Sequence, residues 1–301
     1  MSLPSDHSED PAAQPEEPTA AERPEVDPAL APPPRRIPNL GHALLFVGFA
    51  VLMLMLSLLI LFAVGKSPAV ARDGTVTVPH PKLQLAAMGA TYLATLLAAW
   101  LFYPIVWQRP FLDGLRWNWP TARRQGAKLI GLGFLLGGLA QIATYFISSP
   151  KNLPIDEFFL TPPDAWLITL FGTIAAPVFE EVCFRGFLVP AFAIAYDWLS
   201  FPRTPQGLTH WETTTSLTPA ALIFSAVLSS LLFALLHAQQ IAHVGALLLL
   251  LFSVSLVLTF VRVKTQSVAA SAIVHGTYNF FVFFVVMTQT GAYRHLDRMT
   301  R

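Results

Sequence analysis

Charged side chains are scarce in this chain. Only 12% of its 301 residues are Asp, Glu, Lys or Arg, about half the share that is usual in soluble domains. The sequence also has a single cysteine, Cys183, which excludes an intramolecular disulfide framework and a cluster of thiolates that could bind a metal. The net charge is +1 and the basic residues are scattered, so we expect no nucleic-acid partner.

Apolar residues dominate instead. They make up 54% of the chain, and the mean hydropathy is +0.54. About 20 apolar residues suffice for a helix to cross a bilayer, so the sequence predicts an all-α, polytopic membrane helix bundle with about seven or eight transmembrane helices. The stretch 191–200 after Pro190 is either a bent continuation of the fourth span or a short interfacial helix, which would be the eighth element. The predicted spans are 43–64, 83–106, 127–147, 165–189, 219–238, 241–261 and 267–290.

The first 38 residues differ from the rest. They contain ten prolines and eight acidic residues, with almost no large apolar side chains, which predicts a disordered tail. A positively charged segment followed by a short apolar core is missing there, so we expect membrane insertion to start at the first span. We divide the chain into this tail (1–38), N-terminal transmembrane helices (39–159), a core that carries the polar motifs (160–290) and a C-terminal tail (291–301).

The basic residues near the spans indicate an orientation. Arg35 and Arg36 precede the first span, and five more basic residues lie around the loop after the second. Cytoplasmic loops are enriched in Lys and Arg, so we expect a multi-pass integral membrane protein with a cytoplasmic N-terminus.

The fourth span carries two glutamates and an arginine. Glu181 and Arg185 are four residues apart and share one helix face, whereas Glu180 points about 100° away. Ionisable residues at bilayer depth are costly and usually functional. A structural ion pair accounts for Glu181 and Arg185 but leaves Glu180 unexplained.

Two further spans carry polar residues. His237 follows an apolar run in which Phe233 lies one turn earlier, and His275 and Asn279 share a face of the last span. One shared polar chamber explains all these side chains together, although Asn279 alone could serve a structural hydrogen bond. A carboxylate in such a chamber can activate water, and His and Asn can stabilise an oxyanion, which are the parts needed for peptide hydrolysis.

These residues resemble a known family, the CAAX prenyl protease type II and Abi (CPBP) group of bacterial intramembrane proteases. Its pattern is Glu-Glu-x-x-x-Arg, then Phe-x-x-x-His, then His-x-x-x-Asn or Asp, each on a separate membrane helix. All three motifs occur here in that order, and the resemblance covers about residues 160–290.

The resemblance implies an intramembrane endopeptidase with a cytosol-accessible cavity in a bacterial inner membrane. It assigns water activation to Glu180 with His237, oxyanion stabilisation to His275 and Asn279, and a supporting role to Glu181, Arg185 and Phe233. The substrate would be a membrane-associated or CAAX-like protein or peptide, prenylated or not. The residue types do not decide whether a metal cofactor is bound, because Glu180, His237 and His275 could bind zinc and could equally work without a metal.

Two other functions remain open on the sequence. The same Glu and His residues could form the relay of a proton-coupled transporter, or they could pack the helices of a catalytically silent immunity or scaffold protein. The depths of the motifs also need an explanation. His237 would lie about 27 Å along the fifth helix from Pro219, but His275 only about 12 Å along the seventh. A strong tilt, a later helix start or irregular backbone would bring them together.

Overall fold

The predicted all-α fold is confirmed by the computed structural model, which describes residues 35–64, 69–70, 76–77, 81–148, 150 and 153–300. The strands β1 and β2 are two residues each and pair antiparallel between the first two spans. The helices before the fourth span are α1 (Leu40–Ala63), α2 (Pro81–Trp107), α3 (Phe111–Leu115), α4 (Trp119–Arg124) and α5 (Gly126–Tyr145), and the strands are β1 (Ala69–Val70) and β2 (Val76–Thr77). The remaining elements are η2 (Pro154–Phe159), α6 (Pro162–Leu170), η3 (Phe171–Ala175), α7 (Ala176–Glu181), η4 (Val182–Leu188), α8 (Val189–Ser200), α9 (Pro205–Thr213), α10 (Pro219–Leu236), α11 (Gly245–Thr265), α12 (Val268–Gln289) and η5 (Leu296–Thr300).

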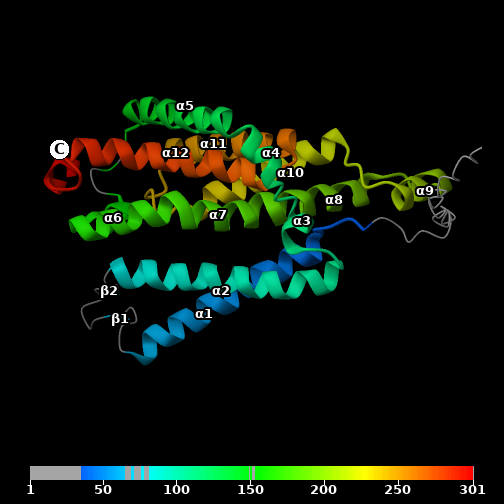
Figure 1. Ribbon diagram of the computed structural model, residues 1–301, viewed down its shortest axis with the longest axis horizontal. Helices are drawn as coiled ribbons and strands as arrows, with labels where there is room; N and C mark the ends of the chain where they lie inside the picture. Colours follow the sequence, from blue (N-terminus) through cyan, green and yellow to red (C-terminus); the bar gives the residue numbers. More distant parts are fainter. Residues whose placement is uncertain are drawn as a thin grey trace, which may run out of the picture.

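Seven helices of the described residues are long and apolar enough to cross a membrane. They match the seven predicted spans, with bounds that differ by a few residues. The fourth is longer than expected, because α6, η3, α7, η4 and α8 form one helical rod over Pro162–Ser200. The stretch 191–200 is therefore a continuation of that span and adds no eighth one (Figure 1).

Most of the predicted tail, residues 1–34, lies outside the described residues. Arg36 belongs to the last residues of that tail and has defined contacts. Its guanidinium donates to the carbonyl oxygens of Trp211 and Thr214 and lies 3.7 Å from the Trp211 ring centroid. The segment just before α1 is thus tied to the loop that holds α9.

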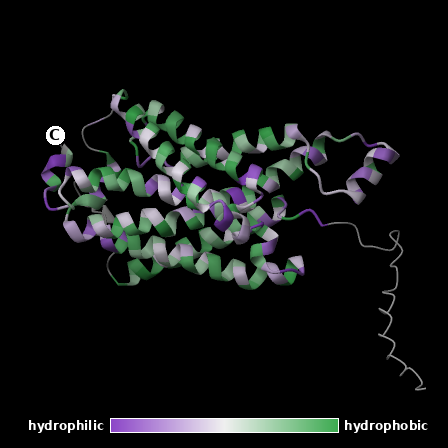
Figure 2. Cartoon of the chain, turned by 45° about the horizontal axis from the view of Figure 1, so that its top comes forward, coloured by the Kyte–Doolittle hydropathy of each residue, from purple (hydrophilic) through white to green (hydrophobic). Residues whose placement is uncertain are grey.

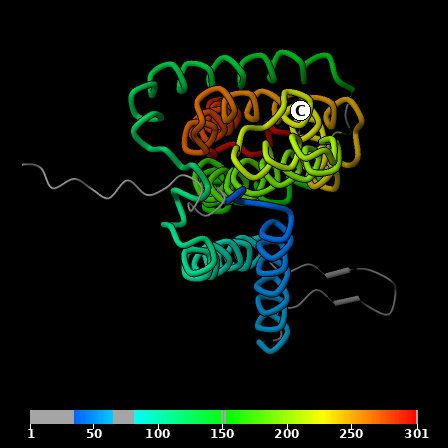
Figure 3. The backbone as a smooth tube through the Cα atoms, turned by 90° about the vertical axis from the view of Figure 1, so that its right-hand side faces the viewer, coloured from blue at the N-terminus to red at the C-terminus, as the bar shows by residue number. Residues whose placement is uncertain are grey.

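The bundle is built around α12. It packs on α5 on one side and on η3 and α7 on the other. Figure 3 shows α5 along one outer edge and α1 projecting at the opposite edge. Small residues allow the close approach of α5, because a Cβ at Gly133 would lie 2.8 Å from the carbonyl oxygen of Val274 and one at Gly137 would lie 2.8 Å from Phe281.

An aromatic core joins α1 and α2 to the fourth span. Phe46 stacks on Phe187 with ring centroids 4.4 Å apart, and Tyr103 contacts both Trp107 and Phe187. The outward faces are apolar as well: Leu59 and Phe62 on α1 are 61% and 70% exposed. Figure 2 shows hydrophobic residues along the spans and hydrophilic ones around α9 and the C-terminal end, as expected where lipid surrounds the spans.

Two anchors fix the depths of the polar motifs. The buried carboxylate of Asp197 in α8 accepts hydrogen bonds from the backbone and the hydroxyl of Thr218, which caps α10. At the start of α12, Ser267 donates to the carbonyl oxygen of Trp117, and the N–H of Val268 donates to that of Arg116. The α10 helix begins at Pro219, so the later start considered above is wrong. Figure 1 shows instead that α10 is displaced along the bundle toward α9 relative to α12. The two motifs meet at the Phe233 ring, which contacts both His237 and His275.

Candidate active site

The glutamates lie on a helix with irregular hydrogen bonding. α7 carries both of them, and π-helical segments flank it on each side. Each π segment ends two residues before a proline, Pro177 or Pro190, which lacks the N–H that would continue the ladder. Such π segments occur frequently at functional sites. Here the carbonyl oxygen of Gly172, five residues before Pro177, accepts a hydrogen bond from a side chain of α12 instead.

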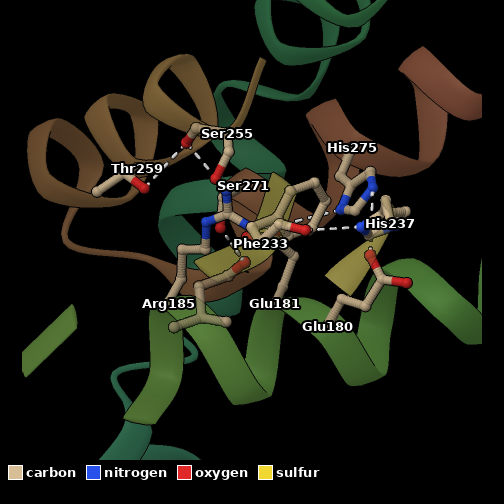
Figure 4. A network of polar contacts seen from close by, with 10 residues as sticks. Glu180, Glu181, Arg185, Phe233, His237, Ser255, Thr259, Ser271 and His275 are labelled. Atoms are coloured by element: carbon tan, nitrogen blue, oxygen red, sulfur yellow. Dashed lines mark hydrogen bonds and ion pairs between the residues drawn. The ribbon is translucent and has the colours of Figure 1, made fainter. Parts of the chain in front are cut away.

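Glu181 and Arg185 form a fully buried ion pair. The Nη1 atom of Arg185 donates to Oε1 of Glu181 at 2.8 Å, and both side chains have no exposed surface. The Nη2 atom donates to the carbonyl oxygen and the hydroxyl of Ser255 in α11, at 2.9 and 2.7 Å. This pair ties the fourth span to α11 (Figure 4).

His275 stands between the two glutamates. Its Nδ1 atom lies 2.9 Å from Oε1 of Glu181, and its Nε2 atom lies 3.7 Å from Oε2 of Glu180. A carboxylate paired with Arg185 can only accept a hydrogen bond, so Nδ1 carries a proton and donates. The Nε2 atom is therefore the one that faces Glu180, as Figure 4 shows.

His237 is oriented in a similar way. It follows the last residue of α10, and its Nδ1 atom lies 2.8 Å from the carbonyl oxygen of Phe233. A carbonyl oxygen accepts, so Nδ1 donates and Nε2 is free for other partners. The Phe233 ring lies between the histidines, with centroid distances of 4.6 Å to His237 and 5.8 Å to His275. It packs on the same face as His237, as the spacing predicted.

Asn279 is held by the irregular backbone of the fourth span. Its Nδ2 atom donates to the carbonyl oxygen of Gly172 at 2.7 Å. In a π-helix that carbonyl would receive its hydrogen bond from residue 177, which is a proline. One turn earlier in α12, a Cβ at Gly276 would lie 2.8 Å from the carbonyl oxygen of Thr173, so only glycine permits this close approach. The interhelical hydrogen bond considered for Asn279 is present.

A cavity of about 230 Å³ joins these side chains. Glu180, His237, His275 and Asn279 all line it, and so does Phe233, whereas Glu181 and Arg185 do not. The side chain of Glu180 keeps 16% of its surface exposed, compared with none for Glu181. The adjacent glutamates thus occupy different environments, one at the cavity and one behind it.

The cavity also has walls that the motifs did not reveal. Tyr92 of α2 lines it and stacks on Phe179 with a centroid distance of 3.9 Å. Gln240, in the turn after α10, contributes a polar group. The local sequence does not indicate that either residue belongs to the site. Tyr92, in particular, comes from a span outside the motifs. The apolar remainder includes Met88, Phe158, Phe171, Tyr278 and Phe283.

Part of the cavity lining comes from connections at one end of the bundle. Ile155 and Phe158 of η2 and Gln240 line the cavity, and they belong to the connections α5–α6 and α10–α11. The segment before α1 and the turn between α11 and α12 lie at the opposite end (Figure 1). If the cavity opens at the end of these connections, a cytoplasmic N-terminus places the opening on the other side of the membrane.

The residues suggested as metal ligands are Glu180, His237 and His275. Within the described part of the chain, no three His, Cys, Asp or Glu side chains lie so that they could hold a metal ion together. The donor set of Glu180, His237 and His275, as it is placed, does not fit a metal site.

Comparison with known proteins identifies the region that holds the site. Residues 162–281 match the sequence model of the family described as type II CAAX prenyl endopeptidase Rce1-like. The match begins at the start of α6 and ends in α12, so it includes all three motifs. Neither the curated proteins nor the solved structures contain a match. Residues 162–281 are therefore similar to the Rce1-like family of type II CAAX prenyl endopeptidases, and this similarity supports an intramembrane protease in general.

Proposed function

We propose that this protein is an intramembrane endopeptidase in which Glu180 activates the water that hydrolyses the peptide bond of the substrate. The observation that carries the proposal is the position of His275, which reaches both glutamates while sharing one cavity with His237 and Asn279. The family of residues 162–281 supports the reaction class. The roles of the individual residues are proposed here in line with the resemblance described above.

In this proposal a water molecule binds between Glu180 and His237. The Glu180 carboxylate accepts one hydrogen of the water, and the free Nε2 atom of His237 accepts the other. As the water oxygen attacks the peptide carbonyl carbon, its proton passes to Glu180. A general base of this kind contributes about 10²–10⁴-fold to a rate.

The oxyanion that forms requires hydrogen-bond donors. Asn279 has a second N–H beyond the one that binds Gly172. We assign His275 its charged form, with Nδ1–H on Glu181 and Nε2–H available to the oxyanion. The charges of Glu180, Glu181, Arg185 and His275 then sum to zero in the chamber, as buried charges require. Preorganised donors of this type are a major source of catalysis.

The second half of the reaction restores the site. Glu180 returns the proton to the leaving nitrogen as the C–N bond breaks, giving a new carboxyl group and a new amine. Glu181 and Arg185 act as positioning residues, because they contact His275 and do not line the cavity. No step is routed through a metal.

The substrate is proposed to be a membrane-associated protein or peptide. The cavity is lined largely by aromatic and aliphatic side chains, which suits an apolar segment or a lipid-modified C-terminus of the CAAX kind.

Charge distribution decides which end we assign to the cytoplasm. Successive segments between the spans lie at alternate ends of the bundle. The segments at the same end as Arg36 and α9 carry ten Lys and Arg residues near the spans, and those at the opposite end carry seven. We therefore keep the cytoplasmic N-terminus and infer that the cavity opens on the other side of a bacterial inner membrane. This inference replaces the cytosol-accessible cavity expected from the resemblance.

The test is hydrolysis by the purified protein in proteoliposomes. The probes are a transmembrane peptide and CAAX peptides with and without a farnesyl group, in water enriched in oxygen-18. Peptidase activity predicts fragments in which each new carboxyl group contains one oxygen-18 atom. Intact peptides together with a pH-dependent ion flux through the protein would support the transporter instead.

A further inference from the structure

A second cavity lies at the N-terminal end of the bundle, away from the active site. Its volume is about 290 Å³, and five arginines line it. Among the residues that the structure describes, Asp113 is the one carboxylate in its lining. The arginines come from four places in the chain that meet at this end: Arg35 and Arg36 before α1, Arg109 after α2, Arg116 after α3, and Arg262 in α11.

Arg262 is the unusual member of this group. It is only 7% exposed, and its one hydrogen bond to the described part of the chain is a long contact of 3.5 Å from Nη2 to the carbonyl oxygen of Leu115. Its Nε atom has no partner, and no ion pair forms with it among the described residues. A buried charge without a direct ion-pair partner is unfavourable, and a bound anion would offset that cost.

The neighbouring guanidinium groups are held in place rather than neutralised. Arg36 donates to three backbone carbonyls and stacks on Trp211, and its buried Nε atom has no partner within the described ranges. Arg116 donates to the side-chain oxygen of Gln266. These partners are uncharged, so they orient the arginines without cancelling their charge.

We propose that this cavity binds a phosphate group. Guanidinium groups bind phosphate through paired N–H donors, and several of them can surround its tetrahedral oxygens. The arginines stand just before α1, just after α2 and in the last turn of α11, which is the level of lipid headgroups. Basic pockets between transmembrane helices are typical binding sites for anionic phospholipids. A soluble phosphate compound would use the same contacts.

The test is native mass spectrometry of the full-length protein in a neutral detergent. The probes are phosphatidylglycerol, phosphatidylcholine and inorganic phosphate. Arg262→Gln and Arg116→Gln should each weaken binding of the anionic probe by about tenfold or more, since each loses hydrogen bonds to a charged group. Arg123→Gln is the matched control, because Arg123 is an exposed basic residue of α4 at the same end and does not line the cavity.

The probes distinguish the sources of the phosphate. Retention of phosphatidylglycerol alone identifies a phospholipid headgroup, and competition by inorganic phosphate identifies a soluble ligand. The melting temperature of Arg262→Gln shows whether the variant is folded. Without ligand it should be no lower than that of the wild type, because the variant lacks the buried charge that has no ion-pair partner. Equal binding of phosphatidylcholine, or an equal loss in Arg123→Gln, would overturn the proposal.

Discussion

The Nδ1 atom of His275 lies 2.9 Å from Oε1 of Glu181, the same oxygen that Arg185 contacts at 2.8 Å. One carboxylate oxygen thus fixes both the histidine ring and the buried cation. Because Glu180 is on the far side of that ring, the orientation of His275 toward Glu180 depends on Glu181. The neighbouring glutamates are linked through a side chain that comes from another helix.

The buried ion pair gives the first prediction. Glu181→Leu leaves Arg185 buried without its counter-ion, so the free energy of unfolding should fall by about 3–5 kcal/mol. The combined variant Glu181→Leu with Arg185→Leu removes both charges and should recover most of that loss. Thermal and denaturant unfolding in detergent measure both variants. A combined variant less stable than Glu181→Leu would contradict the role of the pair.

A second prediction concerns Asn279. In Asn279→Leu the carbonyl oxygen of Gly172 loses its partner, which should cost about 1–3 kcal/mol of stability. Gln289→Leu is the control, since Gln289 is an exposed polar residue at the end of the same helix. The free energy of unfolding should be lower for Asn279→Leu than for Gln289→Leu. Equal stability would indicate that the hydrogen bond to Gly172 contributes nothing to the fold.

The contact between α12 and η3 gives a third prediction. A Cβ at Gly276 would lie 2.8 Å from the carbonyl oxygen of Thr173, so Gly276→Ala must push the helices apart and should cost about 1–3 kcal/mol. The same change at Gly131 meets no atom within 4 Å and should be neutral or slightly stabilising. Activity should fall only in Gly276→Ala, because His275 is its neighbour in sequence.

Sidedness can be measured with two single cysteines in a Cys183→Ser background. Gln206 in α9 and Gln239 after α10 are exposed glutamines at opposite ends of the bundle. In right-side-out vesicles, a membrane-impermeant maleimide should label Gln239→Cys and leave Gln206→Cys unlabelled until the membrane is opened. The reverse pattern would place the cavity mouth on the cytoplasmic side and the N-terminus outside.

Chelation tests the metal-free steps. The donors at the cavity do not converge on a metal position, so cleavage by the purified protein should continue at an unchanged rate after treatment with a strong chelator. Activity that is lost and then restored by zinc alone would require a different arrangement of Glu180, His237 and His275.

The sequence predicted the spans well because each is a nearly uninterrupted apolar run between polar segments. It also selected the side chains that share the cavity, since ionisable residues in apolar helices stand out. It could not reveal the π-helical segments around α7, which depend on how Pro177 and Pro190 remove donors from an already formed helix. Tyr92 and Gln240 were missed because only the packing of distant segments brings them to Glu180.

The positions of His237 and His275 along their helices also depend on contacts that the sequence does not reveal. Helix length from Pro219 gave the correct position of His237 along α10, but the offset between α10 and α12 comes from tertiary anchors. These are the hydrogen bonds of Asp197 to Thr218 and of Ser267 to the backbone at Trp117. Such contacts join residues 21 and 150 positions apart, and no local pattern indicates them.

The most direct test of the account compares Glu180→Gln with Glu157→Gln, which changes an exposed glutamate of η2 outside the cavity. The measurement is the initial rate of peptide cleavage in proteoliposomes, with the melting temperature recorded for each variant. We expect Glu180→Gln to lose about 10²–10⁴-fold or more in rate while it keeps the wild-type melting temperature, and Glu157→Gln to retain full activity. Wild-type cleavage by Glu180→Gln would contradict the assignment of Glu180 as the base.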